Sequence, residues 1–177
     1  MPSAENHGLG SATRVQRTIA FIDLSGFTGY TDSEGDDDAV AILAAFRLIV
    51  RDVCSRHGVR IAKWLGDGAM LISVESEPIL YALRSIITRT NAAEIPLGLR
   101  TGVSTGAVIL FEGDDYIGKS VNLASRLCDD AKPGQVVAEI SILAKLPPGT
   151  ASVPLGKREV PGFHEAVALV DLSIQPA

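Results

Sequence analysis

The sequence has few cysteines, no long apolar run and no excess of positive charge, and each absence excludes a class of protein. Cys54 and Cys128 are the only cysteines, and both lie in helix-like stretches without metal-ligand spacing, so we expect buried free thiols. The longest fully apolar window, residues 39–46, is far shorter than the roughly 20 residues that a membrane span needs. A net charge of −5 argues against nucleic acid as a partner.

The chain fits one domain preceded by a short tail. Its 177 residues, 46% hydrophobic and 21% charged, are typical of a globular domain large enough to bury its own core. Residues 1–16 are rich in Ser, Asn and Gly without hydrophobic period, and we expect a flexible tail there and a single domain over 17–177. Residues 1–17 also lack the apolar centre of a targeting segment. We therefore expect a cytoplasmic protein with no membrane partner.

The stretch 18–28 combines a buried strand with polar groups. An apolar run ends at Asp23, and a carboxylate at the end of a buried strand is costly unless it faces a metal or a solvated cleft. The turn that follows offers the backbone N–H groups of Gly26, Phe27 and Thr28, which together suit an anion. A metal-nucleotide site is one interpretation, and an Asp23 that only caps the turn is the other.

Hydrophobic periodicity and turn signals predict the order of the elements. A strand ends at 23, and acidic residues at 36–38 mark the start of a helix that runs over 39–54, because carboxylates favour the first turn. The remaining predicted strands are 59–64, 69–74, 97–104, 107–111, 135–138 and 166–172, with a turn at 105–106, and the remaining predicted helices are 78–91, 121–130 and a short one at 141–146.

This order predicts an α+β fold. Strand, helix, two strands, helix and strand form the ferredoxin-like βαββαβ core, and additional C-terminal strands complete the sheet. Both main helices of that core cover one face. The opposite face, on which we expect Trp64, then needs another cover, and a second copy of the chain is one way to supply it.

Residues 113–120 (GDDYIGKS) match the phosphate-loop pattern of nucleotide hydrolases. Two adjacent carboxylates inside the loop would repel a triphosphate, and too little chain follows for the parallel strands of such a fold. Lys119 is then an exposed residue at a helix start. Of three interpretations of the chain, we rank a nucleotide hydrolase built on residues 113–120 last.

Three separate segments of the sequence together indicate one family. Residues 21–28 (FIDLSGFT), 63–67 (KWLGD) and 115–126 (DYIGKSVNLASR) resemble the signature segments of class III nucleotidyl cyclases, most closely bacterial adenylate cyclases. The resemblance spans residues 18–172. It implies a lyase that converts ATP to 3′,5′-cyclic AMP and pyrophosphate.

The resemblance implies a metal site and a nucleotide site. Asp23 and Asp67, with the backbone carbonyl of Leu24, would hold two divalent cations, Mg²⁺ or Mn²⁺, which assist attack of the ribose 3′-hydroxyl on the α-phosphate. Lys63 and Asp115 would select adenine, whose N1 accepts and whose 6-amino group donates. Taken alone, Asp67 and Asp115 also suit turns, and Lys63 suits a strand lysine that reaches solvent.

The helix at 121–130 would hold the sugar and the α-phosphate. Asn122 and Arg126 are four residues apart and therefore share a face. The resemblance implies that Asn122 orients the ribose and that Arg126 stabilises charge on the α-phosphate. Without the resemblance, we would expect Arg126 to pair with a neighbouring carboxylate such as Asp129.

The resemblance also implies a head-to-tail homodimer with two shared sites, in which one chain supplies the metal carboxylates and the other supplies the nucleotide-binding residues. Two places depart from the pattern. A phosphate-binding lysine that the family carries is replaced by Pro161, and Lys157 or Arg158 would have to substitute; the hairpin at 108–112 also offers no basic residue where some members have one for pyrophosphate. The missing lysine supports a second interpretation, a catalytically silent cyclase-like domain that binds nucleotide or another chain.

Overall fold

The computed structural model describes residues 13–111 and 115–173. The strands are β1 (Arg14–Leu24), β2 (Arg60–Leu65), β3 (Gly68–Ser73), β4 (Leu99–Phe111), β5 (Asp115–Ile117), β6 (Val136–Glu139), β7 (Ala151–Arg158) and β8 (Val167–Ser173). The helices are α1 (Phe27–Glu34), α2 (Asp36–His57), α3 (Ser76–Ala92), α4 (Lys119–Asp130) and the 3-10 helix η1 (Ile140–Lys145). No helix in these ranges is long and apolar enough to cross a membrane.

The predicted ferredoxin-like core is confirmed. The described strands form one eight-stranded sheet with the order β2-β3-β1-β4-β6-β8-β7, and β5 pairs with β4. β1 pairs antiparallel with both β3 and β4, as the split βαββαβ arrangement requires. The added strands β6, β7 and β8 extend the sheet beyond β4, so the expectation of additional C-terminal strands is also correct.

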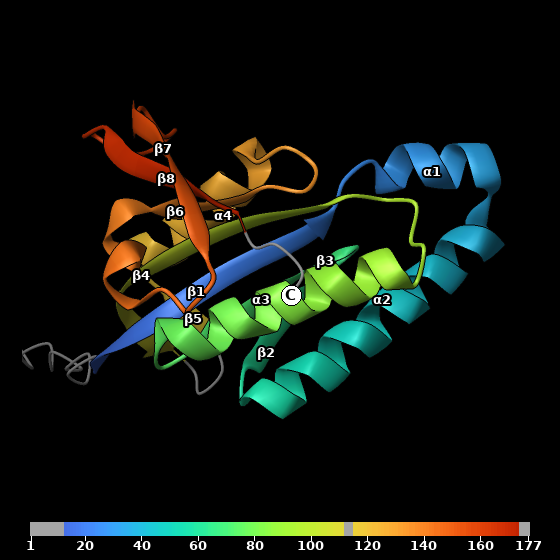
Figure 1. The fold of residues 1–177 in the computed structure, drawn as a ribbon, viewed down its shortest axis with the longest axis horizontal. Coiled ribbons are helices and arrows are strands. Elements are labelled where there is room, and N and C mark those ends of the chain that lie inside the picture. Colours follow the sequence, from blue (N-terminus) through green and yellow to red (C-terminus); the bar gives the residue numbers. More distant parts are fainter. Residues whose placement is uncertain (1–12, 112–114, 174–177) are drawn as a thin grey trace, which may run out of the picture.

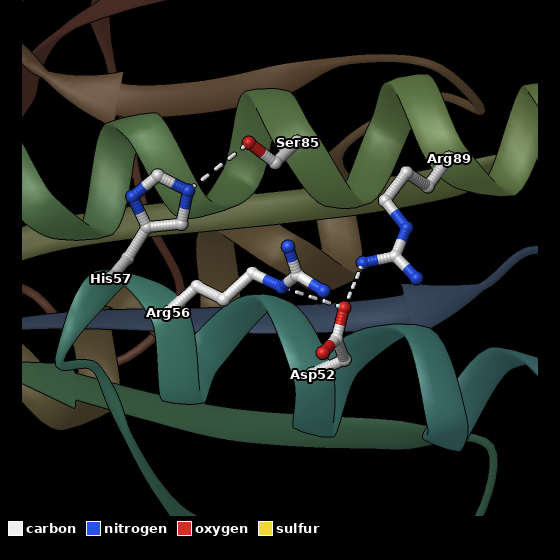
Figure 2. A network of polar contacts seen from close by, with 5 residues as sticks. All are labelled: Asp52, Arg56, His57, Ser85 and Arg89. Carbon is white, nitrogen blue, oxygen red and sulfur yellow. Dashed lines mark hydrogen bonds and ion pairs between the residues drawn. The ribbon is translucent and has the colours of Figure 1, made fainter.

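Helices α2 and α3 lie side by side over one face of the sheet (Figure 1). Three carboxylates, Asp36 to Asp38, occupy the first turn of α2 as predicted, and Gly58 ends the helix with a positive φ of 65°. Figure 2 shows Asp52 of α2 between Arg56 of the same helix and Arg89 of α3. The ion pair with Arg89 joins the two helices, and hydrogen bonds from Arg89 and Arg56 hold the pKa of Asp52 below its usual value. This face is the helix-covered face.

The other face is divided into two parts. Helix α4 packs on the β4, β6 and β8 part through Leu123 and Leu127. The part formed by β1, β2 and β3 carries Ile19, Met70 and Ile72. Helices α2 and α3 do not cover these side chains, but Tyr116 of β5 and Ala124 of α4 pack on them and bury them. We call this part the open face because neither α2 nor α3 covers it.

Two glycines in β4 let α4 approach the sheet. The predicted turn at 105–106 is wrong, because β4 runs without a break and pairs with β1 from Leu99 to Ile109. A Cβ atom at Gly102 would lie 2.1 Å from the carbonyl oxygen of Ala124, and one at Gly106 would lie 2.1 Å from Ser120 Oγ. Close packing of the helix therefore explains these glycines, and no turn is needed.

Four other details differ from the predictions. The first strand begins at Arg14, inside the expected tail, whereas residues 1–12 lie outside the described part. Trp64 packs on the helix-covered face, with Arg47 and Arg51 over its ring, so its predicted position on the opposite face is wrong. Residues 27–34 form a helix and not a simple turn. Strands β5 and β7 were not predicted.

Candidate active site

Asp23 lies near the end of β1, on the open face, and its carboxylate is bound by an arginine. Arg100, its neighbour across the β1–β4 ladder, contacts Asp23 Oδ2 through Nε at 2.8 Å and Nη2 at 2.6 Å. The Asp23 side chain is 22% exposed. Arg100 was not among the predicted site residues. A lone basic residue inside an apolar strand, predicted beside an unpaired Asp, was the signal that could have found it.

Asp67 brings a second carboxylate to the same place. It follows β2 in the turn to β3, and Gly68, the first residue of β3, pairs with Asp23. A Cβ atom at Gly68 would lie 2.8 Å from Asp23 Oδ1, so only glycine leaves that oxygen room. Burial, and then the negative charge of Asp23, raise the pKa of Asp67. A divalent cation would relieve this repulsion.

The chain between these carboxylates and α1 offers main-chain groups. The side chain of Leu24 is buried in the core, which leaves only its backbone for an ion. Gly26 has a φ of 81° and precedes α1, whose first intrahelical bond runs from Tyr30 N–H to the Gly26 carbonyl at 2.9 Å. The N–H groups of Phe27 and Thr28, in the first turn, therefore have no acceptor within the helix. This is the arrangement predicted for an anion.

Lys63 and Asp115 are in contact, although 52 positions separate them in the sequence. Lys63 Nζ lies 2.8 Å from Asp115 Oδ1, and the two side chains are 45% and 42% exposed. Lys63, and then the N–H of Tyr116, hold the pKa of Asp115 below its usual value. Since β2 and β5 lie on opposite sides of β1 in strand order, this contact shows that the β4–β5 hairpin curls over the open face.

Asn122 and Arg126 lie on the solvent side of α4. They line a groove of about 970 Å³ between α4 and the loop that joins β7 to β8. The only ion pair of Arg126 within the described residues is a loose one, at 3.8 Å, to Asp129. The remaining residues along the groove are Ile117, Gly118, Lys119, Ser125, Pro161, Gly162, Phe163, His164 and Glu165.

A tight turn occupies the place where the resemblance implies a phosphate-binding lysine. Phe163 N–H donates to the Val160 carbonyl at 3.0 Å, and Gly162 has a φ of 88°, so Pro161 and Gly162 form the centre of a type II turn. Arg158 borders a pocket of about 230 Å³ together with Arg126 and Pro161. Lys157 does not line that pocket.

The phosphate-loop match does not form a loop in its described part. Asp115 to Ile117 are a strand, and Lys119 begins α4. Gly113 and Asp114 lie outside the described residues. A backbone cradle for phosphates needs its amides in a turn, so a strand in the middle of the pattern argues against the hydrolase.

The chain thus presents two separate groups of predicted site residues. Asp23, Asp67 and the start of α1 form one, at the end of β1. The other consists of the Lys63–Asp115 pair on β2 and β5 and the outer side of α4, and only Gly118 separates β5 from α4. Over residues 13–111 and 115–173, no ion pair links the two groups directly.

A protein-family comparison identifies the domain. The family model described as the adenylate and guanylate cyclase catalytic domain matches residues 11–168. The chain belongs to this family. All three signature segments of the cyclase domain lie within the matched range.

Relatives of this cyclase domain are longer proteins. An uncharacterized protein of Mycobacterium tuberculosis is 34% identical over 160 residues, which are 89% of this chain and 41% of that protein. A pH-sensitive adenylate cyclase of the same organism is 29% identical over 127 residues, which are 72% of this chain and 32% of that protein. The chain thus spans well under half of the length of either relative.

The fold is that of solved cyclase domains. The adenylyl cyclase CyaB from P. aeruginosa superposes with a TM-score of 0.75, at 23% identity, over 92% of this chain and 95% of that one. The class III cyclase fold predicted from the signature segments is therefore confirmed. The identity is too low to carry a substrate over.

The residues present fit a divalent cation. Asp23 Oδ1 is left clear by Gly68, and Asp67 has a raised pKa beside a second carboxylate, which is the electrostatic state that a cation stabilises. Among the described residues, no three or more His, Cys, Asp or Glu side chains are placed so that together they could hold a metal ion. A cation here would therefore need ligands from the backbone, water or substrate phosphates, as Mg²⁺ commonly has.

Proposed function

We propose that this cyclase domain converts ATP to 3′,5′-cyclic AMP and pyrophosphate. The observation that carries the choice of ATP is the ion pair between Lys63 and Asp115, at 2.8 Å. Adenine offers an acceptor at N1 and a donor at its 6-amino group, whereas guanine offers the reverse. A lysine donor beside a carboxylate acceptor matches adenine, and guanine would leave both charges without a partner.

Asn122 and Arg126 act on the sugar and the phosphate in this proposal. They face the same groove, one helical turn apart. Asn122 orients the ribose so that its 3′-hydroxyl points at the α-phosphorus. Arg126 places a permanent, planar positive charge where negative charge develops on the α-phosphate. Its loose contact with Asp129 leaves the guanidinium free to turn toward a substrate.

Asp23 and Asp67, with the Leu24 carbonyl, would hold two divalent cations, Mg²⁺ or Mn²⁺. When bound, the cations make the 3′-hydroxyl easier to deprotonate and neutralise the departing pyrophosphate. The N–H groups of Phe27 and Thr28 and the adjacent turn at Gly26 contribute to binding of the phosphates. Arg100 holds the Asp23 carboxylate in place until a cation arrives.

We propose that two copies of the chain complete each site, head to tail. Asp23 lies near the end of β1 and Asp67 in the β2–β3 turn, whereas Asn122 and Arg126 lie on the exposed side of α4. Because α4 packs on the sheet with that side turned outward, we infer that the two groups of one chain serve different nucleotides. A second chain placed against the end of β1, where the Asp23 side chain is still 22% exposed, would bring its own groove to Asp23 and Asp67.

Product analysis tests this function. Purified protein is incubated with ATP or GTP and with Mg²⁺ or Mn²⁺, and the products are identified by mass spectrometry. The proposal expects cyclic AMP and pyrophosphate in equal amounts, and less product from GTP. Cyclic GMP as the main product would contradict the base choice, and ADP with phosphate would revive the hydrolase.

A catalytically silent cyclase-like domain is the second candidate. Two observations favour it: Arg100 already occupies one oxygen of Asp23, and a rigid Pro161–Gly162 turn stands where the family carries a lysine. Binding of ATP without any product, in the presence of either cation, is the result expected of this candidate.

A further inference from the structure

A bulge in β2 places two basic side chains on the same face. Arg60 and Lys63 are three residues apart, and in a regular strand they would point to opposite faces. The β2–β3 register shifts between Ile61 and Lys63, which makes Ala62 the extra residue of a bulge. Arg60 then pairs with Ile72 and Lys63 with Met70, and both of these β3 residues face the open side.

Both basic residues reach the same short strand. Lys63 binds Asp115, and Arg60 donates from Nη1 to the hydroxyl of Tyr116 at 3.4 Å, with its guanidinium 5.9 Å from the centre of the Tyr116 ring. Tyr116 is only 8% exposed and packs among apolar residues of the open face. Strand β5 is therefore attached to β2 at two consecutive positions.

The two attachments differ in strength. Lys63 and Asp115 are each more than 40% exposed, and an ion pair at such a site contributes little to holding a strand in place. The buried Tyr116 ring, held by Arg60, is the better anchor, because its hydroxyl and its apolar ring are both satisfied. The Tyr116 anchor adds to the β4–β5 ladder, which pairs Phe111 with Asp115, and ties β5 to β2 across the open face.

We propose that Arg60 is a positioning residue for purine selection. Through Tyr116 it fixes β5 so that the Asp115 carboxylate stands beside the Lys63 ammonium before a nucleotide binds. The inference rests on the proposed function, since it assumes that this pair selects the base. Arg60 itself contacts neither half of the pair in the structure and is not expected to touch the substrate.

The test measures discrimination between ATP and GTP in Arg60→Ala, Tyr116→Phe and the double variant. Each single variant should lower the ATP-to-GTP ratio roughly tenfold, the factor that corresponds to one lost hydrogen bond of a charged group. The double variant should lower it no further, because both changes remove the same contact. Arg60→Lys, which keeps a charged donor, should recover part of the ratio.

Arg51→Ala is the matched control. Arg51 also lies over an aromatic ring, that of Trp64, at 5.2 Å, but on the helix-covered face. Its removal should leave the ATP-to-GTP ratio unchanged. Thermal unfolding of every variant checks that a lower ratio does not reflect a loss of folded protein, which would lower both activities together.

The ratio is taken both from cyclisation rates and from dissociation constants. If the wild-type chain binds ATP more tightly than GTP but forms no product, the proposed function is contradicted. The ratio of dissociation constants in the Arg60 variants then still tests the inference. An unchanged ratio in Arg60→Ala, or additive losses in the double variant, would overturn the inference while leaving the function intact. A wild-type chain that binds both nucleotides equally overturns the inference.

Discussion

The two ends of the candidate site treat the same residue type in opposite ways. At the end proposed to select the base, Asp115 stands beside Lys63, and this neighbour lowers the pKa of Asp115. At the end proposed to bind metal, Asp67 lies half-buried beside Asp23, and burial and the like charge raise the pKa of Asp67. Arg100 pairs with Asp23 at this second end, but Asp67 has no ion pair among the described residues.

The difference shows which parts of the site depend on something outside the chain. An aspartate that already has a cationic partner can be in position before the nucleotide arrives, which reduces the cost of binding. Asp67, which lies beside the Asp23–Arg100 pair, gains a partner of its own only when a cation binds. We therefore expect changes at the metal end to affect the reaction itself, and changes at the base end to affect the choice of substrate.

Removal of a metal carboxylate should have the largest effect. Asp23→Ala should lower the rate of cyclic AMP formation by about a thousandfold or more, because loss of cation binding removes several kcal/mol of transition-state stabilisation. The rate is measured by quantifying cyclic AMP at saturating ATP and Mn²⁺. Asp171→Ala, which removes a carboxylate bonded to Gln135 on the far strands, is the control and should keep nearly full activity. An Asp23→Ala chain with more than about a tenth of wild-type activity would exclude Asp23 as a ligand.

Replacement of both residues of the Lys63–Asp115 pair should have the next largest effect. Lys63→Glu combined with Asp115→Cys should lower the ATP-to-GTP ratio by about a hundredfold, because the donor and acceptor that match adenine are lost. The ratio comes from kcat/KM for each nucleotide. A second exposed ion pair, Lys145 with Glu75 at 2.6 Å, supplies the control: Lys145→Glu with Glu75→Cys should leave the ratio alone. Equal ratios in both double variants would remove the pair from base selection.

A smaller effect distinguishes the two candidates for the missing lysine. Arg158 borders the pocket beside Arg126, whereas its neighbour Lys157 does not. Arg158→Ala should raise KM for ATP several-fold, by about the amount of one lost phosphate contact, with kcat little changed. Lys157→Ala should leave KM near the wild-type value. If Lys157→Ala has the larger effect, the assignment is reversed.

The smallest effect is on stability, and it has opposite signs at the two ends. The folded-state pKa of Asp67 lies above the usual 3.8, so folding is favoured at low pH, and this contribution is lost as the pH rises through the folded pKa. Asp67→Asn should therefore raise Tm slightly at neutral pH, by about 2 °C or less, and should leave it unchanged below pH 3.8.

Asp115→Asn should show the reverse. The pKa of Asp115 is lowered from 3.8, so its contribution to stability is present above that value and is lost as the pH falls through the folded pKa. The variant should have a slightly lower Tm than wild type at neutral pH. Both melts are recorded with divalent cations chelated, and added Mn²⁺ should then raise the Tm of wild type more than that of Asp67→Asn. If Asp67→Asn and Asp115→Asn shift Tm in the same direction at neutral pH, the two ends do not differ in their electrostatics.

The sequence was sufficient for the order of the core elements, because local periodicity and turn residues specify them. Asp23 lies one residue before the end of β1, and Asn122 lies on α4, as those patterns indicate. The roles of these residues came from the resemblance and stay predictions. The contact between Lys63 and Asp115 could be inferred only from the resemblance. No local pattern indicates that β5 curls over β2.

What the sequence did not reveal depends on tertiary packing. Gly106 has the local signature of a turn, but it lies in a continuous strand. A glycine is present there because a side chain would collide with Ser120 of α4. Trp64 was expected on the open face, but the strand alternation places it under Arg47 and Arg51. Arg100 was missed because its partner, Asp23, lies on a neighbouring strand 77 positions away. Each of these features requires knowledge of which strands and helices are neighbours.

Complementation between two inactive chains tests most directly whether each site is built from two copies. An Asp23→Ala chain retains its groove, and an Arg126→Ala chain retains its metal carboxylates, so a mixed dimer has one intact site. When equal amounts of the two are unfolded and refolded together, half of the dimers are mixed, and the account predicts about a quarter of wild-type cyclic AMP formation. No activity in a preparation shown by native mass spectrometry to contain the mixed dimer would contradict the shared site.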